Sequence, residues 1–286
     1  MIRLALTDLD DTLIAFGRPR ASDRALAAIH GMLDAGLHFG PVSGRLPAAM
    51  GWMFGGDEAC CATGAYCNGQ MVYLDGEPIS VTSLDGGELD RVAAWLTQNT
   101  DDTVLAVFDV QGGSGVDGDA ICVTTDAQRL GRMGGEFGCA GIVPRLGASS
   151  YVKSNIRCGG SPERRLELRD ALKGEFPAFD FVFPSNWAPL IDITPKGWTK
   201  GSGVRVLADA LGIGLDEVAT FGDSENDLGM IAGFPNSVAV ANASDEVREA
   251  ARWHIGPSSE DSVADALADI AVAAGEGGMP RFMAGA

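Results

Sequence analysis

A chain of 286 residues, 46% of them hydrophobic, is long enough to bury the core of one large domain or of two smaller ones. The formal net charge of -18 repels other polyanions, so the composition argues against nucleic acids and anionic membrane surfaces as partners. The sequence has no apolar run long enough for a membrane-spanning helix, and no basic and apolar leader precedes the first predicted strand. We therefore expect a cytoplasmic protein.

The first part of the chain predicts a β-α-β unit. The apolar run of residues 2–8 predicts a buried strand, and residues 37–42 predict the next one. Ser22 is suited to cap the N-terminus of the helix between them, and Gly36 is suited to end it. The apolar face of this helix is expected to consist of Leu26, Ile29 and Leu33. Strands that alternate with helices favour a parallel sheet with right-handed crossovers.

The middle of the chain departs from this pattern. Asn68-Gly69 and Asp75-Gly76 are signals for hairpin turns, and the residues after them predict a second module of α+β type. Its predicted helices are residues 88–98 and 163–176, and its predicted strands are residues 104–110, 120–125, 179–183 and 190–193. The glycine-rich residues 112–115 predict a flexible hairpin loop rather than a phosphate cradle, because no helix follows them.

The alternating pattern returns near the C-terminus. It predicts a helix over residues 199–211, strands over residues 218–221 and 237–240, and a frayed tail over residues 275–286. The expected fold class is therefore α/β, with a Rossmann-like, doubly wound parallel-sheet core and an inserted α+β domain. We place the core in residues 1–83 and 193–286 and the inserted domain in residues 84–192.

Two carboxylates follow the first predicted strand. Asp8 and Asp10 lie in the segment Leu6-Thr7-Asp8-Leu9-Asp10-Asp11-Thr12-Leu13, at the end of a strand where open α/β sheets bind ligands. One carboxylate could attack a phosphorus centre while the other handles a proton. A divalent cation would be needed to hold so much negative charge together. Taken alone, this motif is equally compatible with a polar turn after a core strand.

Three further segments follow in a recognisable order. They are Val42-Ser43-Gly44-Arg45, Pro195-Lys196-Gly197-Trp198-Thr199-Lys200-Gly201 and Thr220-Phe221-Gly222-Asp223-Ser224-Glu225-Asn226-Asp227. Together with the first segment they resemble motifs one to four of the haloacid dehalogenase-like (HAD) hydrolases, and within that superfamily the chain resembles the Cof-type phosphatases. The likeness covers both halves of the chain and fails mainly in the middle. In the resembled family an insert of this kind is a cap that closes over the active site.

The resemblance implies catalytic and metal-binding roles. Asp8 would be the nucleophile that forms an aspartyl-phosphate, and Asp10 would serve first as the general acid and then as the general base. Mg²⁺ would be bound by the carboxylates of Asp8 and Asp223 and by the backbone carbonyl of Asp10. Asp227 would lie near the metal ion, either in direct contact or through a water molecule.

The resemblance also implies how a phosphate would be bound. Ser43 and the backbone amide of Gly44 would bind a phosphoryl oxygen without adding charge. Lys200 would neutralise the phosphate and the nucleophile, although Lys196 is a competitor for this role. Asn226 would hydrogen-bond the substrate or the phosphate.

The expected function is Mg²⁺-dependent phosphatase activity on small phosphorylated metabolites, with sugar phosphates as the expected substrates. A phosphomannomutase-like phosphomutase and a non-catalytic regulator that binds a phosphometabolite remain open as alternatives. Arg45 could touch the substrate or form a surface pair. The sequence leaves open whether the protein is a monomer or a dimer, and it does not locate the residues that contact the leaving group.

The cysteines and histidines form no metal-binding motif in the sequence. None of the six cysteines pairs with another as Cys-x-x-Cys, and the three histidines, His30, His38 and His254, lie far from one another. We therefore expect buried, reduced thiols and histidines with core or surface roles rather than a zinc site.

Overall fold

The computed structural model describes residues 1–108, 119–132, 139–185 and 188–284, and its internal contacts divide the chain into two units. The first unit comprises Met1–Arg45, Ala49–Ser80 and Thr199–Ala286, and the second comprises Leu46–Ala48 and Val81–Trp198. The predicted glycine-rich loop of residues 112–115 lies outside the described residues. Among the helices that are described, none combines the length and the apolar character needed to cross a bilayer.

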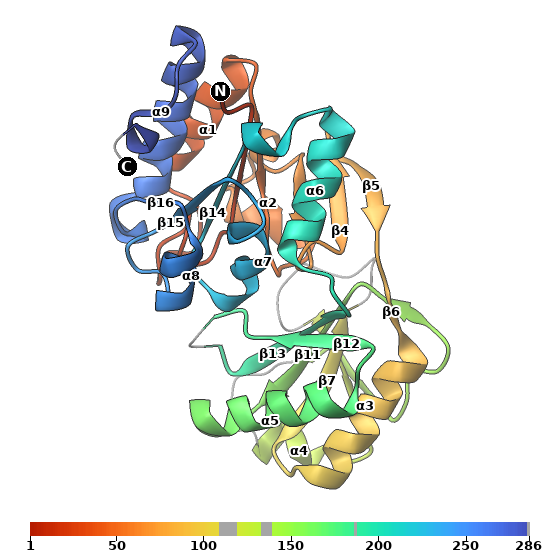
Figure 1. The fold of residues 1–286 in the computed structure, drawn as a ribbon. Helices are drawn as coiled ribbons and strands as arrows, with labels where there is room; N and C mark the ends of the chain where they lie inside the picture. The colour runs from red at the N-terminus through yellow and green to blue at the C-terminus, as the bar shows by residue number, and fades with distance from the viewer. Residues whose placement is uncertain (109–118, 133–138, 186–187, 285–286) are drawn as a thin grey trace. The chain divides into compact units, whose positions relative to one another are not determined.

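A five-stranded parallel sheet forms the centre of the first unit (Figure 1). Its strand order is β16-β15-β14-β1-β2, and every pair is parallel. The strands are β1 (Leu4–Thr7), β2 (His38–Pro41), β14 (Val218–Gly222), β15 (Asn236–Ala239) and β16 (Trp253–His254). All residues of β1, β14 and β15 are buried, as is typical of parallel strands covered on both faces. The predicted α/β class is confirmed.

The helices of the first unit follow the predicted pattern with one correction. They are α1 (Asp23–Asp34), α2 (Met50–Met53), α6 (Lys200–Leu211), α7 (Leu228–Ile231), α8 (Asp245–Ala250) and α9 (Ser262–Glu276). Ser22 caps α1 as expected, since its side chain accepts a hydrogen bond from the backbone N–H of Ala25. The buried face of α1 is Ala25, Ala28, Ile29 and Met32, whereas Leu26 and Leu33 are only partly buried. The prediction is confirmed for Ile29, whereas the buried neighbours of Leu26 and Leu33, which are Ala25 and Met32, were overlooked.

Regular structure extends into the C-terminal segment that was predicted to fray, within the residues that the structure describes. Helix α9 continues to Glu276, and a short 3₁₀ turn follows at Arg281–Met283. The guanidinium of Arg281 donates to Asp269 at 2.6 Å, and Met283 is buried. An ion pair and one apolar anchor therefore hold a glycine-rich segment that its composition alone would leave loose.

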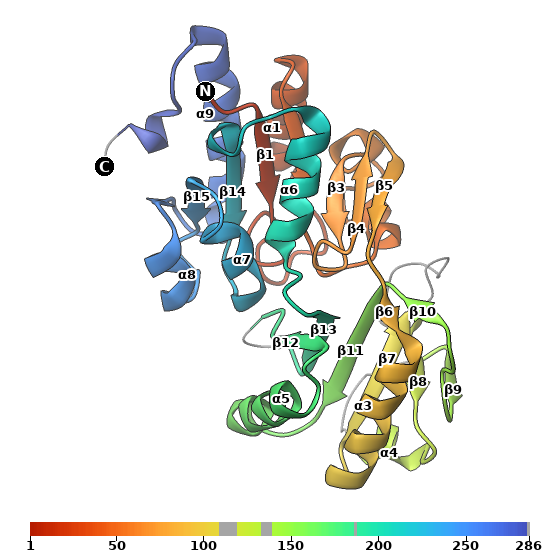
Figure 2. The same ribbon diagram turned by 45° about the vertical axis from the view of Figure 1, so that its right-hand side comes forward.

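A small three-stranded sheet accompanies the parallel sheet in the first unit (Figure 2). Its strands are β3 (Gly64–Tyr66), β4 (Met71–Leu74) and β5 (Glu77–Val81), in that order. Both predicted hairpin turns are present, and Asn68, Gly69, Asp75 and Gly76 all adopt the positive φ that such turns require.

The second unit contains a six-stranded sheet with the order β12-β13-β11-β7-β8-β9. The strands are β7 (Thr103–Phe108), β8 (Ile121–Val123), β9 (Gly141–Val143), β11 (Lys153–Cys158), β12 (Phe179–Val182) and β13 (Leu190–Pro195). The helices are α3 (Gly86–Asn99), α4 (Gln128–Arg132) and α5 (Pro162–Glu175), and β6 (Leu84–Asp85) pairs with β10 (Ser150–Tyr151). The sequence analysis missed the interior strand β11, because its polar residues Lys153, Ser154, Asn155 and Arg157 leave neither an apolar run nor a regular alternation.

The two faces of this sheet differ in polarity. Ile156 of β11 and Ile191 of β13 belong to the apolar core that α3 and α5 cover. Because neighbours along a strand point to opposite faces, Asn155, Asp192 and Thr194 share the other face, and all three are buried. Asn155 Oδ1 and Thr194 Oγ1 have no hydrogen-bond partner among the described residues. The second unit therefore carries a buried polar surface on its sheet.

Candidate active site

Three aspartates meet at the carboxyl ends of two neighbouring strands. Asp8 directly follows β1, and Asp223 directly follows β14, which pairs with β1 in parallel register. Asp227 ends the 3₁₀ turn η5 (Glu225–Asp227) just beyond. Their carboxylate oxygens lie within 4.8 Å of one another, and all three residues are buried. The parallel topology thus brings together carboxylates from opposite ends of the chain.

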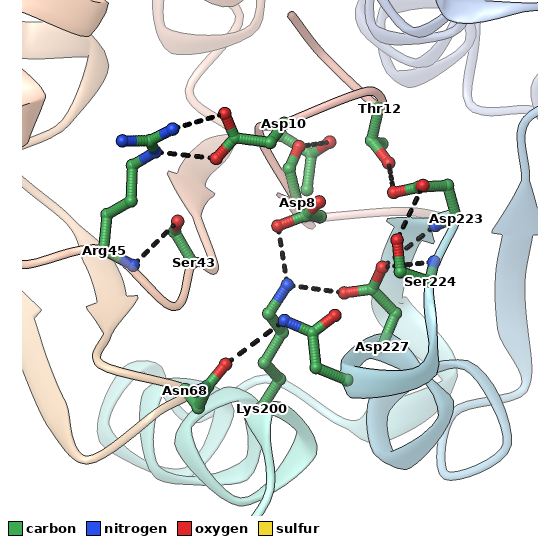
Figure 3. Close-up of polar contacts among 12 residues, drawn as sticks. Asp8, Asp10, Thr12, Ser43, Arg45, Asn68, Lys200, Asp223, Ser224 and Asp227 are labelled. Atoms are coloured by element: carbon green, nitrogen blue, oxygen red, sulfur yellow. Dashed lines mark hydrogen bonds and ion pairs between the residues drawn. The ribbon is translucent and has the colours of Figure 1, made fainter. Parts of the chain in front are cut away.

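Lys200 contacts two of the three aspartates of this acidic cluster (Figure 3). Its ammonium group donates to Asp8 Oδ1 and to Asp227 Oδ1, both at 2.6 Å, and the side chain is 1% exposed. The competitor Lys196 belongs to the second unit, where it pairs with Asp180 at 2.7 Å and is 63% exposed. Of the two lysines, Lys200 is therefore the one that the structure brings into the cluster.

Small residues position the helix that carries Lys200. Thr199 and Ser202 form a capping box at the start of α6, which fixes the first turn of the helix. A Cβ atom at Gly203 would lie 2.8 Å from the Cα of Gly69, and one at Gly201 would collide with the carbonyl of Gly229. These close approaches to the β3–β4 turn and to α7 fix where the Lys200 side chain starts.

Hydrogen bonds fix the loop that contains Asp223 and Asp227. Asp227 Oδ2 accepts from the backbone N–H groups of Asp223 and Ser224, at 2.9 and 3.0 Å. The carboxylate of Asp223 accepts from the hydroxyl of Thr12 at 2.8 Å and from that of Ser224 at 2.7 Å. The sequence analysis placed Asp227 near the metal ion without deciding whether it binds directly or through a water molecule. It did not consider Thr12. The only sequence signal for Thr12 is its position four residues after Asp8.

The three carboxylates of the cluster repel one another, and Lys200 offsets only part of this repulsion. Burial raises the pKa of Asp8 well above its usual value, and Asp227 and Asp223 raise it further although Lys200 opposes them. Burial and Asp227 raise the pKa of Asp223 to about 7. Burial acts to lower the pKa of Lys200, but Asp227 and Asp8 outweigh it and keep the amine charged. Three hard-oxygen carboxylates facing one ammonium group fit a divalent cation, which would relieve this repulsion.

Asp10 lies apart from the acidic cluster. Its carboxylate accepts two hydrogen bonds from the guanidinium of Arg45, each at 2.7 Å, and its side chain is 51% exposed. The Arg45 guanidinium also lies over the ring of Trp52, 5.6 Å from its centroid. Figure 3 shows Asp10 turned toward Arg45 while Asp8 faces Lys200. The sequence analysis left open whether Arg45 touches the substrate or forms a surface pair. In the structure Arg45 forms an ion pair with Asp10, the predicted general acid.

The predicted phosphate-binding residues are linked through Asn68. Ser43 is buried two residues after the end of β2. Its hydroxyl accepts from the backbone N–H of Arg45 at 3.2 Å, and its carbonyl accepts from the N–H of Asn68. The side chain of Asn68 in turn accepts from Asn226 at 3.3 Å, and Asn226 Oδ1 has no hydrogen-bond partner among the described residues. Gly44, between Ser43 and Arg45, is partly exposed. Asn68 was expected only as a turn residue.

This geometry defines a class of protein: an α/β fold with carboxylates at adjacent strand ends and a buried lysine from the start of α6 in contact with them. The family profile described as haloacid dehalogenase-like hydrolase matches residues 5–117 and 154–267. The chain belongs to the haloacid dehalogenase-like hydrolases, and the resemblance drawn from its motifs is confirmed.

Individual relatives agree with this assignment. A phosphoglycolate phosphatase of Methanothermobacter thermautotrophicus is 39% identical over 158 residues, covering 44% of this chain and 71% of the relative. One of Halorubrum lacusprofundi is 47% identical over 78 residues, covering 27% of this chain and only 34% of the relative. The solved structure of the subclass IIB sugar phosphatase BT4131 superposes with a TM-score of 0.74 at 20% identity, covering 93% of this chain and 97% of that one. This last likeness shows the fold.

Proposed function

We propose that this protein is a Mg²⁺-dependent phosphatase that hydrolyses small phosphorylated metabolites, sugar phosphates above all, through an aspartyl-phosphate on Asp8. The observation that carries the proposal is the buried contact between Lys200 and Asp8, beside Asp223 and Asp227. Such an arrangement holds a carboxylate in place while it leaves room for a cation to offset the charge of an incoming phosphate. The relatives named phosphoglycolate phosphatases support a small phosphorylated metabolite as substrate, and the neighbour named a sugar phosphatase is the reason for placing sugar phosphates first.

In the proposed first step Asp8 attacks the phosphorus atom and the bond to the leaving alcohol breaks. Lys200, already on Asp8 Oδ1, orients the nucleophile and offsets the charge of the phosphoryl group. The hydroxyl of Ser43 and the amide of Gly44 bind a phosphoryl oxygen. Asp8, Asp223 and Asp227 would hold Mg²⁺, assisted by the carbonyl of Asp10. When bound, the cation withdraws electron density from the phosphoryl oxygens.

Asp10 is proposed to protonate the leaving alcohol oxygen and then to activate the water that hydrolyses the aspartyl-phosphate. In the structure its carboxylate is held by both ends of the Arg45 guanidinium. Arg45 must therefore release or share this carboxylate when Asp10 acts, which makes Arg45 a residue that positions the acid.

We propose that the second unit is the cap that the family resemblance implies. Its sheet offers a buried polar face with two unused acceptors, Asn155 Oδ1 and Thr194 Oγ1. Acceptors of this kind suit hydroxyl groups, so this face is a candidate for recognition of the leaving group of a sugar phosphate.

The test of the proposed function is phosphate release from a panel of phosphorylated sugars, nucleotides and cofactors, with Mg²⁺ and with EDTA. Release that depends on the metal would support the proposal and rank the substrates. A phosphomutase would instead interconvert isomers and release little phosphate, and a regulator would bind the ester without turnover. Absence of release from every ester would contradict the proposal.

Asp10→Ala is expected to slow hydrolysis in a way that depends on the leaving group. An alkyl phosphate needs a proton at its departing oxygen, so we expect a loss of about 10²- to 10⁴-fold, the usual contribution of a general acid. Nitrophenyl phosphate scarcely needs this proton, so the release of nitrophenol in a pre-steady-state burst should be affected least. Equal losses on both esters in this burst would argue against the role of Asp10 as an acid.

Gly222→Ala is expected to reduce turnover although it touches no substrate. A Cβ atom at this position would lie 2.6 Å from Asp227 Cβ and 2.7 Å from its Cγ, so Asp227 would have to move. Because misplacement of a catalytic group by about 1 Å can cost roughly 10²-fold, we expect a loss of that order in kcat/KM. Gly31→Ala is the matched control, since a Cβ there meets nothing within 4 Å. Equal activity of the two variants would contradict the role of this packing.

A further inference from the structure

A second cluster of metal-ligating side chains lies in the first unit. His30 of α1 contacts Asp57 through Nε2 and Oδ2 at 2.7 Å, and the sulfur of Cys60 lies 3.9 Å from the same ring nitrogen. One ligand atom from each of the three residues lies within 4.8 Å of the other two. None of these residues takes part in the proposed phosphatase chemistry. The sequence analysis expected no such cluster, because the three histidines lie far from one another along the chain and the cysteines form no Cys-x-x-Cys pair.

We propose that His30, Asp57 and Cys60 bind a transition-metal ion of the Zn²⁺ class, with water as the fourth ligand. An imidazole, a carboxylate and a thiolate are ligands that Zn²⁺ accepts, whereas Mg²⁺ selects oxygen ligands alone. As the metal binds, the Cys60 thiol loses its proton to solvent, and the hydrogen that His30 Nε2 donates to Asp57 leaves that nitrogen, with Nδ1 carrying the proton of the neutral ring. This site is therefore chemically distinct from the carboxylate cluster of Asp8.

Two of the separations within the cluster can be compared with those of a tetrahedral site. Metal–ligand bonds of about 2.0–2.3 Å place neighbouring tetrahedral ligand atoms roughly 3.3–3.6 Å apart. The observed separations of 2.7 and 3.9 Å lie on either side of this range. Binding would require His30 and Asp57 to separate by roughly 0.6 Å and Cys60 to approach by less than that. Small side-chain rotations supply such movements.

The carboxylate of Asp57 contacts both other members of the cluster. Asp57 is the N-cap of the 3₁₀ turn η2 (Glu58–Cys60), a position where aspartate commonly accepts from the backbone of the turn. Here its side chain contacts His30 at 2.7 Å, and it also accepts hydrogen bonds from the Cys60 thiol and from the backbone N–H of Ala59. The neighbouring Cys61 differs from Cys60, because its sulfur faces the backbone carbonyls of Asp57 and Glu58. Cys60 therefore belongs to the cluster, whereas the adjacent Cys61 does not and can serve as its control.

The location of the cluster indicates what the metal would do. His30 lies in the middle of α1, and the other two ligands lie in the segment that leads to β3. Cys60 is fully buried, whereas the side chain of His30 is 45% exposed, so the fourth position opens toward solvent. A bound ion would cross-link α1 to this segment and stabilise the first unit, as any ligand of the folded state does.

The test uses Co²⁺ as the probe, added to reduced, EDTA-treated, full-length protein. A thiolate-to-cobalt charge-transfer band in the near ultraviolet is expected, and Zn²⁺ should displace it. Only a sulfur ligand gives this band, so cobalt bound by the carboxylates of Asp8, Asp223 and Asp227 does not interfere. The band should persist in Asp223→Asn, which weakens the carboxylate cluster.

Matched variants decide whether the cluster is the source of the band. Cys60→Ser should abolish the band and Cys61→Ser should retain it. His30→Gln should weaken cobalt binding at least about tenfold while leaving the fold intact, because the His30 side chain is partly exposed. The absence of a band in the wild type, its survival in Cys60→Ser, or unchanged binding by His30→Gln would each overturn the site.

Discussion

Asp8→Asn is expected to abolish phosphate release while leaving the fold intact. The amide has the shape of the carboxylate but cannot attack phosphorus, so we expect kcat to fall on the order of 10⁴-fold or more, as when other enzymes lose a nucleophile or its activation. Lys200 keeps Asp227 as a partner at 2.6 Å, and one source of repulsion within the acidic cluster disappears. The thermal midpoint should therefore change little, and steady-state phosphate release and calorimetry would check both expectations.

Asp180→Asn is the control for this variant. Asp180 also pairs with a lysine at 2.7 Å, but the pair belongs to the second unit and its lysine is largely exposed. Turnover by Asp180→Asn should be close to that of the wild type. Substantial turnover by Asp8→Asn would show that another group is the nucleophile.

Lys200→Ala is expected to have the second large effect, on both stability and chemistry. The variant leaves Asp8 and Asp227 buried without the ammonium that both contact. Removing one partner of a buried ion pair typically costs 3–5 kcal/mol, so we expect the free energy of unfolding to fall by about that amount without metal. Losing a charge that stabilises the transferred phosphoryl group should also lower kcat/KM by about 10²- to 10³-fold.

Lys196→Ala is the control for Lys200→Ala, because it removes a lysine that lies outside the acidic cluster. Lys196 forms an exposed pair with Asp180, and exposed pairs contribute at most about 1 kcal/mol. Denaturant unfolding and phosphate release should therefore distinguish the two variants clearly. A Lys200→Ala protein with near-normal kinetics, combined with an impaired Lys196→Ala protein, would assign the role to Lys196 instead.

Local signals in the sequence were sufficient to predict many of the helices, strands and turns of the first unit. The apolar run before Asp8, the N-cap Ser22 and the turn Asn68-Gly69 each act through nearby residues, and each predicted the observed element. The lysine at the start of α6 could be chosen over Lys196 because the resemblance supplied its place in the motif. Contacts within a few residues, or a shared motif, made these features predictable.

Features that depend on distant contacts could not be predicted in this way. Strand β11 is buried although many of its residues are polar, so a search for periodic apolar residues does not detect it. The hydrogen bond from Thr12 to Asp223 and the approach of His30 to Cys60 join parts of the chain that only the tertiary fold brings together. The pairing of Asp10 with Arg45 likewise depends on how two strand ends are spaced.

The most direct test of the central claim is to locate the phosphoryl group on the protein. Asp10→Asn should still be phosphorylated by nitrophenyl phosphate with Mg²⁺, because the leaving group departs unaided, but it should lack the base that hydrolyses the aspartyl-phosphate. After an acid quench, peptide mass spectrometry should find the phosphoryl group on Asp8. Hydrolysis of the ester without phosphate on Asp8, or with phosphate on another residue, would contradict the proposed mechanism.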